Sequence, residues 1–555
     1  MELDDDYLSR QLIAYIGNKR SLLPFLARVF TRLTDATETV TFLDPFCGSG
    51  SVSRLGKYLG YRVLANDWEP YARIVTECHV AVDKNELEGL FLSRGGAAAV
   101  FEAINTAGSN NRDPGYITCH YAPSRTDSAD YRYERLFYTR ENALFIDGAR
   151  DLIEEWFPRE GREKIILLSS LLYQAATHAN TSGVFKAYHK GFGGHGKDAL
   201  KRIMQPMKLE IPLVINSGGD FKCEACSMDA VKFVEGRSCL LCYLDPPYNN
   251  HQYGSNYFML NSIALWDKPE ISMARGEDNR LREKAGIRKD WVKTRSSYCS
   301  KYTAGDSFRK LLDMIDARYI CLSYNTEGII PFEELCDTMA SQGKLTLQSE
   351  DYVKYRGGKQ SISRNTHNIE FLLVLDRKKT TADGDRKTAV KFFAIKKIHT
   401  LLKRSFVPGR IKEQFMKKEG SLILVAKDGQ EITASMRDNF RFETMPSYEE
   451  LTRVDLADLT VLEEKLIYCL CRDRKEECDV LVEVLKTELP PYRRKTLQRL
   501  LVQVVRKFSH KKYRKEFFQV WDELSNLSSA DPERFGAMKP HLEEIRRIAL
   551  LRFSG

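Results

Sequence analysis

The segment Asp245-Pro-Pro-Tyr248 places a carboxylate, two rigid prolines and an aromatic ring directly after the apolar run 239–244. The carboxylate and the carbonyl of Pro246 can both accept hydrogen bonds from an exocyclic amino group, and Tyr248 can stack on the ring that carries it. A surface turn is the alternative for Asp-Pro-Pro, but such a turn fits poorly straight after a buried strand. Ligands bind at the carboxyl ends of parallel strands, so we expect a site for an aminated aromatic ring here.

A second motif, Asp44-Pro-Phe-Cys-Gly-Ser-Gly50, follows the short apolar strand 41–44 and leads into a helical run, 51–59. Its glycines let the backbone approach a ligand closely, above the N-terminus of the helix. A nicotinamide-dinucleotide site would place a third glycine where this chain has Ser53. The motif therefore indicates a ligand-binding loop without by itself identifying the ligand.

Asp67 ends the next apolar strand, 61–67. In dinucleotide-binding folds, a carboxylate at this place accepts hydrogen bonds from ribose hydroxyls. The alternative is a strand-end aspartate that caps the following helix. Together with the glycine motif, Asp67 favours the binding of a nucleoside.

These motifs, with one more at residues 12–24, stand in the order found in amino-directed DNA methyltransferases of the Dam-like adenine class, which the chain resembles over residues 12–376. In that family an aromatic residue and a lysine of the N-terminal motif contact S-adenosylmethionine. The resemblance also implies that the methionine moiety lies over the glycine motif and that the ribose binds the acid of the next strand. The implied catalytic residues are Asp245, Pro246, Pro247 and Tyr248, and the implied cofactor-binding residues are Tyr15, Gly17, Lys19, Asp44, Phe46, Gly48, Gly50, Asp67 and Asp229.

Two of the matches are weaker than the others. Asp229 follows the strand-like run 221–226 and falls where the family holds the adenine ring of the cofactor. The family usually has Phe beside this position, and this chain has Ala230. Residues 322–325 fall where a later strand of the family turns back toward the site.

The resemblance implies transfer of a methyl group from S-adenosylmethionine to the N6 amino group of an adenine flipped out of double-stranded DNA, in restriction-modification or epigenetic marking. Asp245 and the Pro246 carbonyl would hold the amino group, and the reaction needs neither a metal ion nor a covalent intermediate. Methylation at a cytosine carbon uses a cysteine after a proline, and none of the 18 prolines here precedes a cysteine. The sequence therefore predicts transfer to an amino nitrogen.

Three alternatives stay open. Methylation of the N4 amino group of cytosine uses the same chemistry, although such enzymes usually begin the tetrad with Ser. RNA or protein amide targets typically go with Asn at that place. A DNA-binding defence protein with a degenerate methyltransferase fold agrees less well with the intact Lys19, Asp67, Asp245 and Tyr248.

Apolar runs alternate with helical patterns, which predicts an α/β fold: the Rossmann-like sheet of S-adenosylmethionine-dependent methyltransferases with inserted target-recognition segments. We expect residues 1–82 and 213–376 to form the catalytic domain. Residues 83–212 are then an inserted target-recognition region, and residues 249–318 a second DNA-facing insertion. The strand-like runs are 41–44, 61–67, 221–226, 239–244, 319–323 and 369–375, and the first insertion contains an apolar helix at 164–176.

The first insertion also contains the run 186–197, which interleaves basic residues, aromatics and glycines. This pattern is typical of a mobile loop that contacts phosphates and stacks on bases, and an ordinary exposed loop is the alternative. The predicted DNA-binding residues are Lys186, Lys190 and Lys197.

Basic charge is concentrated in the last third of the 555 residues. Residues 377–555 hold 38 Lys and Arg against 27 Asp and Glu, which leaves 47 against 49 for residues 1–376. After a turn-rich linker at 377–387, we expect a basic, largely helical accessory domain over residues 388–555 that contacts DNA or a partner protein. A solvated basic surface is the alternative.

The composition, 43% hydrophobic and 11% aromatic, excludes a mainly disordered chain. The acidic first residues do not resemble a leader, and no segment is apolar enough to cross a bilayer. We therefore expect a cytoplasmic protein of a bacterium or phage that associates with the nucleoid, with a cognate restriction endonuclease as a candidate partner.

The 13 cysteines are an odd number, which favours reduced thiols over a disulfide framework. Cys223-x-x-Cys226 and Cys239-x-x-Cys242 have the spacing of zinc ligands. Residues three apart in a strand point to opposite faces, however, so we expect buried thiols and no metal site.

Overall fold

The computed structural model describes residues 6–34, 39–194, 199–325, 328–348, 370–380, 383–427, 430–437, 440–510 and 513–554. The described residues up to 380 form one compact unit, and those from Asp383 onward form a second. The turn-rich segment expected over 377–387 is shorter than predicted, because a helix, α16, already begins at Asp383.

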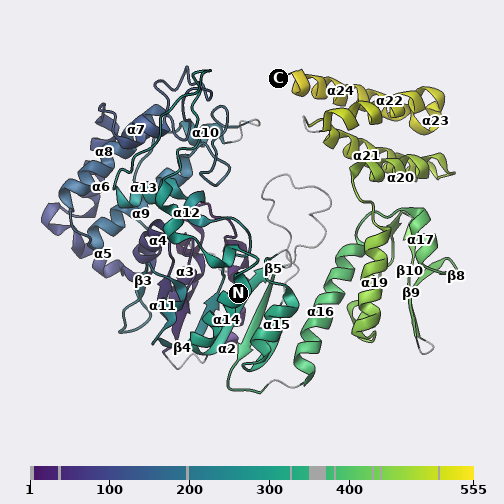
Figure 1. Ribbon diagram of the computed structural model, residues 1–555, viewed down its shortest axis with the longest axis horizontal. Helices are drawn as coiled ribbons and strands as arrows, with labels where there is room; N and C mark the ends of the chain where they lie inside the picture. The colour runs from purple at the N-terminus through teal and green to yellow at the C-terminus, as the bar shows by residue number, and fades with distance from the viewer. Residues whose placement is uncertain are drawn as a thin grey trace. The chain divides into compact units, whose positions relative to one another are not determined.

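The first unit is built on a sheet that has seven strands within the described residues (Figure 1). In spatial order these are β3 (Glu224–Cys226), β2 (Arg62–Asn66), β1 (Thr41–Asp44), β4 (Ser238–Leu244), β5 (Asp316–Asn325), β7 (Glu370–Asp376) and β6 (Lys344–Gln348). Neighbouring strands are parallel except for the two pairs that contain β7. Each predicted strand-like run overlaps one of these strands, and β6 is not among the predicted ones.

The central strands β1, β4 and β5 are apolar along most of their length because helices cover both faces of a parallel sheet. The strand order changes direction between β1 and β4, since β2 continues the chain on one side of β1 and β4 lies on the other. A crevice forms at the carboxyl edge where the order changes. Asp44 is the last residue of β1, and Asp245 directly follows β4, so both carboxylates lie at this crevice.

Helices α3, α4 and α15 pack directly on the sheet: α3 on β1 and β2, α4 on β2 and β3, and α15 on β6 and β7. The helices of this part of the unit are α1 (Asp6–Ser9), η1 (Arg20–Leu22), α2 (Leu23–Leu33), α3 (Ser51–Tyr58), α4 (Pro70–Ala81), α11 (Ala230–Val234), α14 (Ala304–Met314) and α15 (Phe332–Ala340).

Arg54 of α3 anchors the segment that precedes the N-terminal motif. Its side chain is only 1% exposed, and burial lowers the pKa of its guanidinium to about 10. The guanidinium donates hydrogen bonds to the backbone carbonyls of Tyr7, Arg10 and Gln11 at 3.1, 2.9 and 3.0 Å. These bonds fix the start of the chain against α3, just before the residues predicted to contact the cofactor.

The first insertion is helical in its described part and gathers at one end of the unit, in blue in Figure 1. Its helices are α5 (Lys84–Leu90), η2 (Leu92–Arg94), α6 (Ala97–Asn110), α7 (Tyr116–Tyr121), α8 (Arg140–Trp156), α9 (Arg162–His178) and α10 (Leu200–Met204). Helix α9 confirms the predicted apolar helix. The second insertion contributes α12 (Tyr253–Asn256), α13 (Phe258–Leu265), η3 (Lys289–Thr294) and η4 (Ser297–Cys299).

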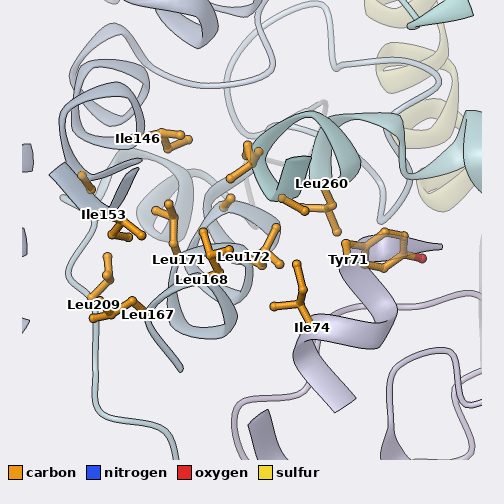
Figure 2. Close-up of a cluster of buried hydrophobic side chains, with 14 of the residues drawn as sticks. Tyr71, Ile74, Ile146, Ile153, Leu167, Leu168, Leu171, Leu172, Leu209 and Leu260 are labelled. Carbon is orange, nitrogen blue, oxygen red and sulfur yellow. The ribbon is translucent and has the colours of Figure 1, made fainter. Parts of the chain in front are cut away.

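Both insertions share one hydrophobic core with the sheet domain. Figure 2 shows Leu168, Leu171 and Leu172 of α9 packed between Ile146 of α8 and the helices α4 and α13. The insertions are therefore continuous with the sheet domain rather than separate domains on flexible linkers.

The second unit begins with mixed structure and ends in a helical bundle. Its elements are α16 (Asp383–Leu402), α17 (Pro408–Gln414), β8 (Lys417–Lys418), β9 (Ser421–Lys427), β10 (Gln430–Ala434), β11 (Met436–Arg437), β12 (Arg441–Phe442), α18 (Tyr448–Thr452), α19 (Leu456–Cys469), α20 (Arg474–Lys486), α21 (Pro491–Phe508), α22 (Arg514–Ala530), α23 (Pro532–Phe535), η7 (Gly536–Met538) and α24 (Lys539–Ser554). The apolar faces of α20, α21, α22 and α24 form one core. Among the described helices, none is both long and apolar enough to cross a membrane.

We expect Leu171→Ala to lower the free energy of unfolding of the first unit by about 2–5 kcal/mol, because it leaves a cavity in the shared core. Leu92→Ala is the control, since Leu92 is 71% exposed and its loss should cost less than about 0.5 kcal/mol. Unfolding in urea, monitored through the hydrogen exchange of the α9 amides, reports on this unit alone. Equal effects of the two substitutions would contradict the packing of α9.

Candidate active site

A pocket that is open to solvent lies at the edge where the strand order changes. It brings together twelve of the thirteen residues predicted for catalysis and cofactor binding, and Gly50 is the exception. The twelve are Tyr15, Gly17, Lys19, Asp44, Phe46, Gly48, Asp67, Asp229, Asp245, Pro246, Pro247 and Tyr248. Residues from five separate segments of the chain thus converge on one cavity.

The glycine motif shapes the floor of this pocket. Gly48 has a φ of +52°, and a Cβ atom there would lie 2.8 Å from the ring of Tyr15. Gly50 has a φ of +75° and precedes α3, where a Cβ atom would lie 2.8 Å from Oγ1 of Thr76. Both positions therefore require glycine, the first to admit an aromatic ring and the second to seat the helix.

Asp44 presents an unused acceptor atom to the pocket. Its side chain is 1% exposed, and Oδ2 accepts a hydrogen bond of 2.6 Å from Ser53. Oδ1 is buried and has no hydrogen-bond partner among the described residues. Burial raises the pKa of Asp44 to about 7, against the opposing effect of the Ser53 bond. A buried acceptor of this kind fits a cationic donor group on a ligand.

Asp67 is held in place by two backbone amides. Oδ2 accepts from Gly48 N and Oδ1 from Glu69 N, each at 2.9 Å, while burial raises its pKa to about 6. The preceding Asn66 joins neighbouring strands: its amide nitrogen donates to the carbonyls of Pro45 and Met228 at 3.1 and 3.0 Å, and its oxygen accepts from Met228 N. Asn66 thus fixes the loops that carry the glycine motif and Asp229.

Lys19 and Asp245 form an ion pair inside the pocket. Lys19 is 3% exposed, its Nζ lies 3.2 Å from Asp245 Oδ1, and it lies 5.2 Å from the centre of the Tyr248 ring. Burial opposes the charge of Lys19, but Asp245, Tyr248 and Glu370 outweigh it and raise its pKa well above the ordinary value. Burial likewise raises the pKa of Asp245 to about 6, although Lys19 opposes the rise. At neutral pH Asp245 is therefore largely ionised.

The carboxylate of Asp245 keeps acceptor capacity despite this ion pair. Its Oδ1 is buried and accepts no hydrogen bond of normal geometry, although the ammonium group of Lys19 is close. Tyr248 stands beside it with an edge-to-face contact to Tyr324 of β5, at 5.7 Å between ring centres. An acceptor next to an aromatic face is the arrangement that the sequence predicts.

Tyr15 belongs to a stack of three tyrosines. Its ring lies 5.2 Å from that of Tyr253 and 5.1 Å from that of Tyr257, and both pairs are stacked. The hydroxyl of Tyr257 also accepts a hydrogen bond of 2.8 Å from Ile16 N. The second insertion therefore holds the N-terminal motif in place.

Asp229 lines the pocket, but it also caps a helix. Its Oδ1 accepts from the amides of Val231 and Lys232 at 3.0 and 3.4 Å, at the start of α11. Where the family usually has Phe, Ala230 lines the pocket without offering a ring. Two aromatic residues that line the same pocket, Tyr298 of η4 and Phe46, pack edge to face at 5.2 Å between ring centres.

Several residues of the pocket are missed by the sequence reasoning. Glu69 is buried, accepts a hydrogen bond from Asn261 at 2.5 Å and has its pKa raised by burial to about 7. Its place two residues after Asp67, at the start of a helix, is a signal that could have identified it. The second insertion, predicted to face DNA, also lines the pocket through Tyr253, Thr294, Ser296 and Tyr298. No motif in the sequence indicates those four residues.

The predicted DNA-binding loop differs from expectation in its aromatics. Phe192 is buried with Leu136 and Ile203, and Tyr188 packs edge to face on Phe137 at 5.0 Å. Phe192 is therefore a core residue rather than an exposed stacking ring, and Tyr188 is half-buried against Phe137. The side chain of the buried Asn180 bonds to the backbone of the loop, donating to His189 O and accepting from Gly193 N.

Two of the three lysines predicted to bind DNA lie within the described residues. Lys186 and Lys190 are exposed, and Lys190 lies 5.3 Å from the ring centre of Tyr131. Lys186 lies close enough to the thiol of Cys299 that its charge opposes the rise which burial causes in the pKa of Cys299. Lys197 lies outside the described residues.

The two cysteine pairs do not converge. The first pair lies at β3 and the second in β4, with β2 and β1 between them, a separation of about 14 Å at the usual strand spacing. Burial raises the pKa of the Cys242 thiol, and the neighbouring Cys239 thiol adds to the rise. Within the described residues, no group of three or more His, Cys, Asp or Glu is arranged to hold a metal ion.

Comparison with known proteins agrees with this geometry. The family described as D12 class N6 adenine-specific DNA methyltransferase matches residues 15–335, more than half of the chain. The chain belongs to this family. Membership implies DNA as substrate and a methyl donor of the S-adenosylmethionine type. The match includes every segment of this D12 methyltransferase that lines the pocket.

Individual relatives of this methyltransferase are bacterial and viral. Type II methyltransferase M.NlaIII of Neisseria lactamica is 30% identical over 369 residues, which cover 65% of this chain and 99% of that protein. Type II methyltransferase M.CviAII of Paramecium bursaria Chlorella virus 1 is 26% identical over 66% of this chain and 99% of its own length. Modification methylase LlaI of Lactococcus lactis subsp. lactis is 29% identical over 66% of this chain, and the chain spans only 55% of LlaI.

We expect Gly48→Ala to weaken the binding of S-adenosylhomocysteine at least tenfold, because the new Cβ would displace the Tyr15 ring from the pocket. Gly60→Ala is a matched control: Gly60 also has a positive φ, of +82°, but a Cβ atom there would meet nothing within 4 Å. Isothermal titration of both variants measures the difference. Equal losses would attribute the effect to backbone strain and remove Tyr15 from the argument.

Proposed function

We propose that this protein methylates the N6 amino group of an adenine flipped out of double-stranded DNA, using S-adenosylmethionine. The observation that carries the proposal is the ionised Asp245 at the switch point of the sheet, with acceptor capacity left over and the Tyr248 ring beside it. The strand order 3-2-1-4-5 of the first five strands supports a Rossmann-like methyltransferase sheet.

The residues of the pocket fit the cofactor. Asp44 has a buried, unpartnered oxygen that suits the ammonium group of the methionine moiety, and Gly48 leaves the space that a side chain would fill. Asp67, fixed by two backbone amides, is in position to accept from ribose hydroxyls. For the adenine ring, Asp229 lines the pocket, and Tyr298 offers an aromatic surface in place of the missing Phe.

The target amino group would donate its hydrogens to Asp245 and to the Pro246 carbonyl. These bonds draw electron density back onto a nitrogen whose lone pair is otherwise delocalised into the ring. Tyr248 stacks on the extruded base and offsets part of the unstacking cost of a few kcal/mol. When bound, S-adenosylmethionine supplies the methyl group, and its S–C bond breaks with the electron pair returning to sulfur as the N–C bond forms. The methylated nitrogen then loses one proton to Asp245 or to water.

The remaining parts of the chain would bind DNA. Residues 83–212 and 249–318 would read the recognition sequence, while phosphate contacts position the duplex. In the second unit, α21 carries exposed basic residues, among them Lys495, Arg499, Arg506 and Lys507, which supports a role of the accessory domain in contacting the DNA backbone.

The names of the relatives, type II methyltransferases and modification methylases, support a role in restriction-modification. A cognate restriction endonuclease is then the partner to look for. A chain that modifies genomic DNA would act on the nucleoid, in the cytoplasm of a bacterium or of a phage-infected cell.

We expect Asp245→Ala and Asp245→Asn to lower methyl transfer at least a hundredfold, because the amino group loses its charged acceptor. Transfer from labelled S-adenosylmethionine to unmethylated DNA, followed by digestion to nucleosides, measures both the rate and the base. Asp220→Asn, an exposed carboxylate away from the pocket, is the control. Label in N4-methylcytosine would overturn the choice of base, and no label on any DNA would overturn the proposed substrate.

We expect the double substitution Lys186→Ala and Lys190→Ala to weaken DNA binding and to reduce the salt dependence of binding by roughly one to two charges. Fluorescence anisotropy at several salt concentrations gives the slope of log affinity against log salt. The matched control is Lys222→Ala, an exposed lysine just before β3 and outside both insertions. An unchanged slope would remove the 186–194 loop from the DNA interface.

A further inference from the structure

A carboxylate that belongs to none of the predicted motifs reaches the site from β7. Glu370 is the first residue of that strand and pairs with Asn325, the last residue of β5. Because β7 runs antiparallel to β5, its N-terminal end lies at the same edge as the carboxyl ends of β1, β4 and β5. The antiparallel strand therefore brings an acid to the crevice.

Glu370 shares the ammonium group of Lys19 with Asp245. Lys19 Nζ lies 3.8 Å from Glu370 Oε1 and 3.2 Å from Asp245 Oδ1. The three side chains are 3%, 25% and 17% exposed for Lys19, Glu370 and Asp245, so water screens their charges poorly. The cluster holds one positive and two negative charges.

The net negative charge of this cluster determines how strongly Asp245 can attract an incoming amino group. Paired with Lys19 alone, Asp245 would form a neutral ion pair and would offer an incoming amino group little net charge. With Glu370 beside Lys19, one carboxylate balances the ammonium group and the other remains in excess. Oδ1 of Asp245 is buried and faces Lys19, so the excess charge reaches the pocket through the part of the Asp245 side chain that stays 17% exposed.

We propose that Glu370, given methyl transfer at this site, is a positioning residue: it compensates the charge of Lys19 and so leaves the cluster with a net negative charge toward the target amino group. The amino nitrogen becomes positively charged when it gains the methyl group and stays so until a proton leaves. A negative surplus at Asp245 stabilises that charge as it develops. Glu370 itself acts through Lys19 and need not touch the substrate.

The charge of Glu370 also affects the protonation of Asp245. Burial raises the pKa of Asp245 to about 6, Lys19 lowers it, and Glu370 raises it. Activity that needs the ionised form should therefore fall as the pH drops below about 6. Removal of the negative charge of Glu370 lowers the pKa of Asp245 and moves this acid limb to lower pH. The charged and titratable groups that face Asp245 are Lys19, Glu370, Asp44, Tyr243, Tyr248 and Tyr253.

The first test is the pH profile of single-turnover methyl transfer by Glu370→Gln, which keeps the shape of the side chain. We expect the rate at neutral pH to fall roughly tenfold, less than the loss of a group that touches the reacting atoms, while the acid limb moves to lower pH. Glu370→Asp, which restores the charge, should recover part of the rate and return the acid limb of the pH profile toward its wild-type position. Glu333→Gln, at an exposed position on α15, is the matched control. A Glu370→Gln enzyme with the wild-type rate and acid limb would overturn the inference, and so would a fall in rate with an unmoved acid limb.

The second test does not depend on activity. Sinefungin carries an ammonium group where S-adenosylmethionine carries its charge, and S-adenosylhomocysteine is neutral there. If Glu370 supplies a negative surplus, Glu370→Gln should lower the preference for sinefungin over S-adenosylhomocysteine by roughly threefold to tenfold, as isothermal titration would measure. An unchanged preference would overturn the inference. Wild-type protein that shows this charge preference but methylates no DNA would instead overturn the proposed function.

Discussion

The site depends on the interaction of the buried ammonium group of Lys19 with two carboxylates. An ammonium group in a protein interior is costly unless carboxylates and hydrogen-bond acceptors surround it. Asp245 and Glu370 meet that need, at 3.2 and 3.8 Å, and Lys19 in turn holds together two carboxylates that would otherwise repel each other. Three remote parts of the chain, the N-terminal motif, the end of β4 and the start of β7, are joined by this one contact.

Everything that surrounds Lys19 serves to bring those three parts to one edge. The switch in strand order between β1 and β4 sets Asp44 beside Asp245, and the reversed direction of β7 adds Glu370. Arg54 fixes the start of the N-terminal segment, and the tyrosine stack fixes the motif itself. The helical insertions share their core with α4, which follows Asp67, so they also stiffen the side of the pocket that carries Asp67.

The sequence predicts the site well where chemistry and strand ends coincide. Asp44, Asp67 and Asp245 each end an apolar run, and parallel strands bring their carboxyl ends to one edge whatever the distance along the chain. Glu370 escapes this reasoning because it begins its run, and the direction of a single apolar strand cannot be read from its residues. Tyr298 and Thr294 escape it because their place depends on tertiary packing of a long irregular segment. Conversely, Phe192 looks like an exposed stacking residue in sequence, but packing with Ile203 makes it a core residue. Tyr188 is half-buried against Phe137.

The number of carboxyl groups in the pocket is itself informative. Asp44, Asp67, Glu69 and Asp245 all lie in this one pocket with pKa values that burial raises to between about 6 and about 7. A fold selected for stability alone would not bury four carboxylates around one cavity, because each disfavours the ionisation of the others. A cationic ligand resolves the conflict, since its charge lowers the pKa of every carboxyl group near it. The negative cavity therefore suits a cationic ligand, as the proposed binding of the methyl donor requires, beside the fixed positive charge of Lys19.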